Sequence, residues 1–122
     1  MDAHGGRVED LDAACEGVRP KLVYVVPDFA NPTGACMSIE RRRALVRWAV
    51  RREVTVMEDD PYGALRTRGE ALPSIAALAA EVPGASRWIA QASTLSKTVA
   101  PGLRTGWLLL PPWLREAVVL IK

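Results

Sequence analysis

The chain has 122 residues, of which 49% are hydrophobic and 25% are charged, a composition typical of a globular domain. Its 16 Lys and Arg are spread along the chain against 14 Asp and Glu, so the formal net charge is +2. This balance gives no reason to expect a nucleic-acid or membrane-surface partner. The run Arg41-Arg42-Arg43 opens an apolar helical pattern, so we interpret it as a solvated helix face rather than a basic patch.

Cysteine and histidine are too few for a disulfide framework or a zinc site. The chain has Cys15, Cys36 and one histidine, His4, in an expected turn, without a CxxC spacing. The residues after Met1 do not form a basic segment followed by an apolar one, so no secretory signal is visible. No apolar run approaches the roughly 20 residues of a membrane span. We therefore expect a cytoplasmic protein with no metal site and no membrane partner.

The first half of the chain alternates helical and extended patterns. The apolar residues between 8 and 15 are spaced as one face of a short helix. Residues 21–26 contain three β-branched valines and no polar alternation after Lys21, which predicts a strand buried on both faces in a parallel sheet covered by helices. After a loop of turn residues, Ser38 is predicted to cap a helix over 39–52. A second buried strand is predicted over 54–57.

The second half continues the alternation. We predict a short helix begun by proline over 73–80, a strand over 87–92 and a strand over 106–110. A last helix over 113–122 follows two prolines and stops without a cap. Strands and helices in this order predict an α/β fold, with part of a mostly parallel sheet and flanking helices. Four strands need more helical cover than this chain supplies, so we expect an incomplete domain.

The polar loop between the last two predicted strands carries the most informative residues. Thr94 and Ser96 place hydroxyls beside Lys97, and Arg104 follows across a Pro-Gly turn. Hydroxyls and a guanidinium suit a phosphate, because phosphate accepts several hydrogen bonds and pairs with arginine through two of them. A lysine with a lowered pKa can form a Schiff base with an aldehyde. Phosphate and aldehyde together describe pyridoxal 5'-phosphate (PLP).

A simpler interpretation makes Lys97 a solvated loop lysine and Arg104 a surface charge, as most such residues are. Two further segments favour the cofactor. Asn31 follows the first predicted strand, and Asp59 and Tyr62 follow the second. The carboxyl ends of strands in an open α/β sheet lie along one edge, where ligands bind. The sequence therefore predicts one site built from three separated segments.

Three motifs in this order resemble the core of the fold-type I PLP-dependent aminotransferases of class I/II. They are Asn31-Pro32-Thr33-Gly34, Glu58-Asp59-Asp60-Pro61-Tyr62-Gly63 and the stretch from Ser93 to Arg104. The nearest likeness is to the 2-aminoadipate and kynurenine aminotransferase branch, and it covers the chain from about residue 8 onward. Each motif alone is a modest signal, whereas three in the right order are specific.

The resemblance implies transamination between an amino acid and a 2-oxo acid. Lys97 would form the internal aldimine and later carry a proton between Cα of the substrate and C4' of the cofactor. Asp59 would face the pyridine nitrogen and keep it protonated, so that the ring accepts the electrons released at Cα. A simpler alternative is that the carboxylates of Asp59 and Asp60 only cap the following turn, and we assign that role to Asp60.

The resemblance also implies the remaining cofactor contacts. Tyr62 and Asn31 would hydrogen-bond the phenolic oxygen of the ring, and Thr94, Ser96 and Arg104 would hold the phosphate. Tyr62 could instead pack on the sheet, and the Asn-Pro-Thr-Gly segment reads equally well as a turn, in which Thr33 serves only the turn.

Several parts of such an enzyme have no counterpart in residues 1–122. These are an upstream segment with a ring-stacking aromatic residue and a small C-terminal domain that binds the substrate carboxylate. We therefore expect residues 1–122 to be a partial PLP-binding large domain, inactive alone, from a protein that forms a homodimer. The alternative function is a PLP-sensing aminotransferase-like domain of a winged-helix transcription regulator. The amino donor and acceptor cannot be identified from these residues.

Overall fold

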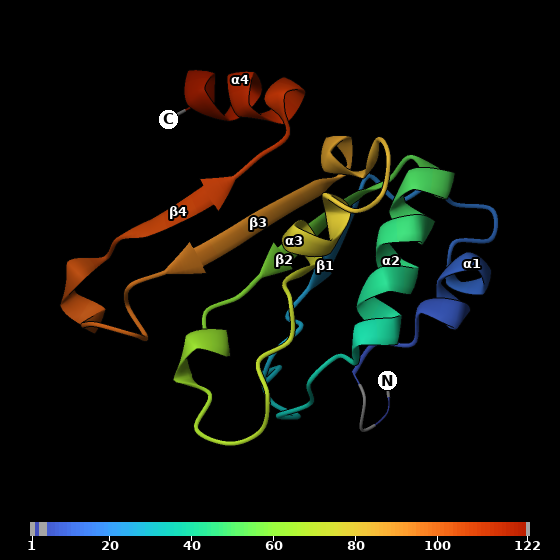
Figure 1. The fold of residues 1–122 in the computed structure, drawn as a ribbon. Coiled ribbons are helices and arrows are strands. Elements are labelled where there is room, and N and C mark those ends of the chain that lie inside the picture. The colour runs from blue at the N-terminus through green and yellow to red at the C-terminus, as the bar shows by residue number, and fades with distance from the viewer. Residues whose placement is uncertain (1, 3–4, 122) are drawn as a thin grey trace.

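The computed structural model describes residue 2 and residues 5–121, so the turn expected at His4 and the last residue of the terminal helix lie outside the described residues. A four-stranded sheet runs through the molecule (Figure 1) in the order β1-β2-β3-β4. Its strands are β1 (Leu22–Val25), β2 (Thr55–Asp59), β3 (Ile89–Thr94) and β4 (Gly106–Leu109). The first three are parallel and β4 is antiparallel to β3, which confirms the predicted mostly parallel α/β sheet.

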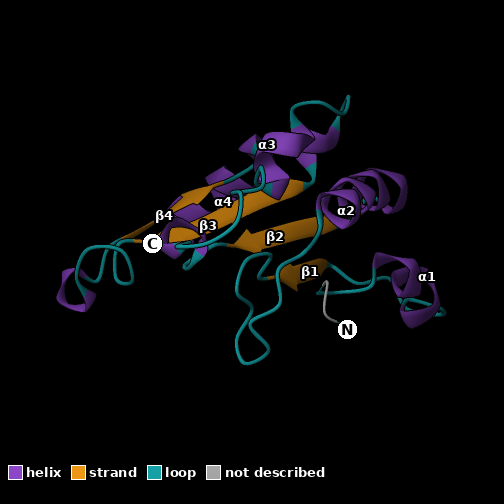
Figure 2. Cartoon of the chain, turned by 60° about the horizontal axis from the view of Figure 1, so that its bottom comes forward, coloured by secondary structure: helices purple, strands orange, loops and turns teal. Residues whose placement is uncertain are grey.

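Four α-helices and four short 3-10 helices accompany the sheet within the described residues. The α-helices are α1 (Leu11–Ala14), α2 (Ile39–Arg52), α3 (Ile75–Ala79) and α4 (Pro112–Ile121). The 3-10 helices are η1 (Val8–Asp10), η2 (Gly63–Leu65), η3 (Ala85–Arg87) and η4 (Pro101–Leu103). Helices α2 and α3 lie on the same face of the sheet, as Figure 2 shows. None of the described helices is both long and apolar enough to cross a membrane.

Helix α2 has the predicted bounds because its capping residue is present in the sequence. The Ser38 side chain accepts a hydrogen bond from the Arg41 amide at 3.4 Å, which satisfies one of the free N–H groups of the first turn. The helix ends at Arg52 and is capped by Glu53, whose φ of +53° is left-handed and whose amide donates to the carbonyls of Ala49 and Val50. The helix-forming signal was therefore local, and the prediction of this element is confirmed.

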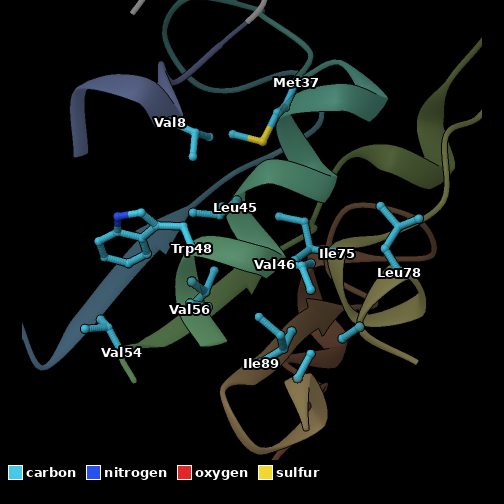
Figure 3. Close-up of a cluster of buried hydrophobic side chains, with 13 residues drawn as sticks. Val8, Met37, Leu45, Val46, Trp48, Val54, Val56, Ile75, Leu78 and Ile89 are labelled. Carbon is cyan, nitrogen blue, oxygen red and sulfur yellow. The ribbon is translucent and has the colours of Figure 1, made fainter. Parts of the chain in front are cut away.

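The core lies between α2, α3 and the face of the sheet beneath them (Figure 3). Trp48 and Leu45 are each 1% exposed and meet Val56 of β2, while Ile75 of α3 and Ile89 of β3 are also buried. Burying a large apolar side chain contributes about 1.5–3 kcal/mol relative to leaving it in water. These contacts fix α2 and α3 on the sheet and thereby hold β2 and β3 in place.

The predicted two-sided burial of the first strand is wrong. In β1, Leu22 and Tyr24 are 48% and 58% exposed, whereas Val23 and Val25 point to the other face and pack against the core. Helices α2 and α3 pack on the face to which Val23 and Val25 point, so Leu22 and Tyr24 lie on the opposite face, which these two helices leave uncovered. The alternation was invisible in the sequence because the side chains on both faces are apolar or aromatic.

The start of α3 differs from the prediction of a proline-begun helix over 73–80. Ser74 caps the helix, its side chain accepting from the Ala77 amide at 3.0 Å. The buried Glu58 carboxylate of β2 accepts from the amides of Ile75 at 2.8 Å and Ala76 at 3.0 Å. Burial is the main cause that raises the pKa of Glu58, and these two hydrogen bonds oppose it. A strand side chain thus anchors the first turn of α3.

The interpretation of Arg41-Arg42-Arg43 as a solvated face is wrong for Arg42, which is fully buried. Its guanidinium donates to Asp28 Oδ1 at 2.9 Å and to the carbonyls of Met37 and Pro73, each at 3.0 Å. Arg66 donates to the same Asp28 oxygen at 2.6 Å. This buried network joins α2 to the loops that follow β1 and β2, both of which lead toward the candidate site.

Candidate functional site

The three predicted site segments leave the sheet at the same end. The loops after β1, β2 and β3 all follow the carboxyl ends of parallel strands (Figure 1). Two hydrogen bonds tie the β2 and β3 ends together: the Asp60 amide donates to the Ala92 carbonyl at 3.0 Å, and the Ser93 hydroxyl donates to the Asp60 carbonyl at 2.8 Å. The start of each loop is therefore positioned by the sheet.

Asp59, the last residue of β2, points to the uncovered face of the sheet. Its Oδ2 accepts a hydrogen bond from the phenolic hydroxyl of Tyr24 on β1. Tyr24 is in register with Met57, so Asp59 lies two residues further along the same face. Within the described residues, the Asp59 carboxylate makes no other hydrogen bond or ion pair. One carboxylate oxygen is held and the other is free to accept a donor.

Sequence reasoning did not select Tyr24, although the structure pairs it with a predicted site residue. The hydrogen bond to Asp59 is the largest cause that raises the pKa of Tyr24 to about 12, followed by partial desolvation and the negative charge of Asp59. A smaller contribution comes from Tyr62, so Tyr62 lies within electrostatic reach of this pair. The signal in the sequence was a single hydroxyl-bearing side chain in an otherwise aliphatic strand.

Asp60 has the turn-capping role that we assigned to it. Its Oδ1 accepts from the Gly63 amide at 2.7 Å, which closes the turn that leads into η2. A Cβ on Gly63 would lie 2.7 Å from the Asp60 carboxylate oxygens, so only glycine fits while this contact is kept. Tyr62, inside this turn, is half-buried. The two neighbouring carboxylates thus differ: Asp60 is hydrogen-bonded within the turn, and Asp59 points to the uncovered face of the sheet.

The Asn31 segment is a tight turn. Thr33 Oγ1 donates to the Ala30 carbonyl at 3.2 Å and accepts from the Ala35 amide at 3.3 Å, which is the turn role expected for it. The Asn31–Pro32 peptide bond is cis. Asn31 itself is exposed, and its side chain makes no hydrogen bond within residues 2 and 5–121. The turn is self-contained and leaves the Asn31 amide available.

The lysine loop between β3 and β4 is closed at its base. The Leu95 amide donates to the Thr105 carbonyl at 2.9 Å, and Thr94 Oγ1 donates to the same carbonyl at 3.0 Å. Thr94 Oγ1 also accepts from the Ser96 amide at 3.1 Å. To donate to a phosphate, the Thr94 hydroxyl would have to leave the Thr105 carbonyl, because a hydroxyl has one donor.

Lys97 and Arg104 are exposed on this loop. Neither side chain makes an ion pair or hydrogen bond in the described part of the chain. Arg104 has a φ of +48°, a left-handed conformation that costs an L-residue about 1–2 kcal/mol. Strained backbone of this kind is found more often at ligand sites than elsewhere. Both cations are thus uncommitted, in contrast to the fully bonded Arg42.

Some of the predicted site residues are hydrogen-bonded to each other, as Thr94 is to the Ser96 amide, and others are related only by the pairing of their strands. Asp59 and Thr94 lie on one face of adjacent strands, since Asp59 pairs with Ala92 and Thr94 follows two residues later. Among the described residues, the cavities of 220–560 Å³ are lined by other residues than Lys97, Asp59 and Arg104. The three segments share an edge of the sheet, and Phe29 and Tyr62, from the loops after β1 and β2, line a cavity of 290 Å³.

The comparisons with known proteins place the chain in a family. Residues 4–122 match the family described as aminotransferase class I and II, so the chain belongs to that family. Its fold aligns with the crystal structure of LysN, the α-aminoadipate aminotransferase of Thermus thermophilus, at a TM-score of 0.90 and 28% identity. This alignment covers 98% of the chain and 30% of LysN, which was solved with N-(5'-phosphopyridoxyl)-L-leucine. The resemblance stated from the motifs is confirmed.

Relatives of two kinds match this chain. Aromatic-amino-acid aminotransferase 1 of Thermococcus litoralis is 38% identical over 97 residues, which cover 80% of the chain. An uncharacterized HTH-type transcriptional regulator of Bacillus subtilis, YisV, is 35% identical over 122 residues and is matched by the whole chain. The chain spans 22% of the first protein and 24% of the second, so it corresponds to about a quarter of the relatives that it matches.

Proposed function

We propose that residues 1–122 form part of the PLP-binding large domain of an aminotransferase that exchanges an amino group between an amino acid and a 2-oxo acid. The observation that carries the proposal is an uncommitted lysine, Lys97, on a loop of the same sheet edge as Asp59, in a chain of the aminotransferase class I and II family. The similarity to LysN, solved with a phosphopyridoxyl adduct, supports PLP as the cofactor.

The donor set suits PLP group by group. A free carboxylate oxygen at Asp59, and an amine at Lys97 and a guanidinium at Arg104 that are unpaired among the described residues, match a pyridinium nitrogen, an aldehyde and a phosphate. When bound, the cofactor supplies an electron sink that stabilises the carbanion formed at Cα of the amino acid. The protein's task is to hold the cofactor and to move protons at defined atoms.

Each predicted residue has one role in this proposal. Lys97 would hold the cofactor through Nζ, and its amine would move a proton between Cα of the substrate and C4' of the cofactor. The Asp59 carboxylate keeps the ring nitrogen protonated. Asn31 and Tyr62 hydrogen-bond the phenolic oxygen, which fixes the orientation of the ring.

The phosphate contacts complete the set. Arg104 would pair with the phosphate and the Thr94 and Ser96 hydroxyls would donate to it, so these three residues would anchor the cofactor independently of Lys97. We further propose a cytoplasmic homodimer, with residues 1–122 inactive on their own because they carry neither a ring-stacking segment nor a small domain. The identity of the amino donor depends on those other segments.

Replacing Lys97 by alanine in the complete protein tests this function. Incubation with PLP, reduction with borohydride and peptide mapping should label Lys97 in the parent protein and leave K97A unlabelled, with loss of transamination. Lys21→Ala is the matched control, because Lys21 is an exposed lysine at the other end of the sheet, beside the start of β1. Labelling of another lysine with activity retained in K97A would overturn the assignment.

A second function is favoured by the match of the whole chain to the regulator YisV. On this alternative the same residues bind PLP as a sensed ligand, and a winged-helix domain carries the output. A helix-turn-helix sequence upstream in the same gene, together with PLP-dependent binding to a promoter fragment and no transamination, would select the regulator over the enzyme.

A further inference from the structure

We propose that Tyr24 is a positioning residue for the cofactor: its phenol holds one oxygen of the Asp59 carboxylate so that the other is presented to the ring nitrogen. This inference rests on the proposed function, because it assigns Asp59 to the pyridinium. Tyr24 lies outside the three motifs that define the predicted site.

The sheet places Tyr24 where it can act on Asp59 alone. Tyr24 lies on β1 and Asp59 on β2, on the same uncovered face, and the tyrosine side chain reaches along the diagonal between the strands. The hydroxyl donates to Oδ2, and Tyr24 makes no other side-chain hydrogen bond within the described residues. The neighbours of Tyr24 on β1, Val23 and Val25, face the core and cannot replace it.

A carboxylate at a strand end has a terminal torsion with a broad energy minimum, so its two oxygens are not distinguished by the backbone. A hydrogen bond to Oδ2 selects one orientation and leaves Oδ1 as the acceptor for an incoming N–H group. The phenol is protonated at neutral pH even with the ordinary pKa of 10.0, and the pKa of Tyr24 is raised further, to about 12, so Tyr24 is a donor to the carboxylate. The pair therefore presents a fixed, singly occupied carboxylate.

A double-mutant cycle in the complete protein separates positioning from a general structural role. Tyr24→Phe keeps the ring and removes the hydroxyl, and we expect it to weaken PLP binding about tenfold, the size of one hydrogen bond to a charged group. In an Asp59→Ala background the same change should have no further effect on the PLP dissociation constant. An equal weakening in both backgrounds, or none in either, would overturn the inference.

A titration without cofactor gives an independent readout. The phenolate absorbance lost in Tyr24→Phe should rise near pH 12 in the parent protein and at a lower pH, closer to the ordinary value of 10.0, in Asp59→Ala. An unchanged titration in Asp59→Ala would show that the two side chains are not paired and would reject the inference. Absence of PLP binding to the parent protein, with the titration shift present, would instead reject the proposed function. Leu22→Ala, on the same face two residues earlier, is the control and should change neither readout.

Discussion

The region packed under α2 and α3 and the region formed by β4 and α4 differ sharply in burial. In the first, Trp48 is 1% exposed and Ile75 is fully buried. In the second, Trp107 is 50% exposed and Leu109 is 58% exposed. Both regions are rich in apolar side chains, so composition does not explain the difference. What differs is packing, because α2 and α3 contribute buried side chains to the core, whereas every residue of β4 is exposed and none of the described residues of α4 is buried.

The predicted site spans the boundary between these two regions. Asp59 is the last residue of a strand whose other face is packed against the core, whereas Lys97 and Arg104 lie on the loop that leads into β4. Segments with few buried contacts open at low free-energy cost, and ligand-binding loops commonly belong to them. We therefore expect the region under α2 and α3 to provide most of the stability, and the loop that carries Lys97 and Arg104 to be the part of the site that can change conformation.

The largest expected effect comes from removing a tryptophan on each side of the boundary. Trp48→Ala should lower the free energy of unfolding by about 3–5 kcal/mol, because it leaves a cavity in the core and removes the hydrogen bond from Trp48 Nε1 to Asp12 at 2.9 Å. Trp107→Ala should cost less than about 1 kcal/mol by the same measure. Urea unfolding followed by circular dichroism measures both, and equal losses would contradict the comparison.

A smaller effect is expected from the buried arginine. Arg42→Met should lower the free energy of unfolding by about 3 kcal/mol, because Asp28 loses a buried partner and the carbonyls of Met37 and Pro73 lose their donor. Arg43→Met, one position along the same helix, removes an exposed pair at 3.9 Å to Glu81 and should cost about 0–1 kcal/mol. Should the two variants melt at the same temperature, the network does not stabilise the fold.

The smallest effect concerns Glu58 and depends on pH. Its pKa is raised above 4.5, so the folded state binds the proton more tightly than the unfolded chain. The stability from this carboxyl is therefore fully present below pH 4.5 and falls as pH rises through the folded pKa.

Glu58→Gln cannot titrate, so its stability should not fall as the pH rises. Because glutamine has one acceptor oxygen where glutamate has two, one hydrogen bond to the first turn of α3 is lost, at a cost of about 1 kcal/mol. Melting temperatures measured while the pH is raised from about 4 to about 7, starting below the ordinary pKa of a glutamate, would reveal the difference between Glu58→Gln and the parent protein. Glu70→Gln, a change at an exposed glutamate, should follow the parent protein throughout this range. A parallel pH dependence in Glu58→Gln would count against the raised pKa.

Signals between neighbouring residues predicted the bounds of helices and strands better than they predicted which side chains are buried. The bounds of α2 were predicted because Ser38 and the helical pattern are adjacent in the sequence. The burial of Arg42 depends on Asp28 and Pro73, which are distant along the chain, although its helical spacing from Leu45 and Ala49 places it on the buried face.

The candidate site shows the same limit. The three motifs predicted which strand ends carry the site, because turn residues and polar groups interrupt apolar runs there. The Tyr24–Asp59 hydrogen bond was not predictable, because it depends on which strands are neighbours and on their register. Whether Lys97 reaches Asp59 likewise depends on the conformation of a loop of roughly 10 residues, which local preferences do not determine.

Two consecutive carboxylates at the end of β2 serve opposite sides of the sheet. Glu58 binds the first turn of α3 and Asp59 faces Tyr24, because successive strand residues alternate in direction. Inserting or deleting one residue in β2 would exchange these two environments, so that the helix anchor and the proposed cofactor ligand would be lost together. The packing of α3 and the proposed cofactor contact therefore both depend on which residues of the five-residue strand β2 point to each face of the sheet.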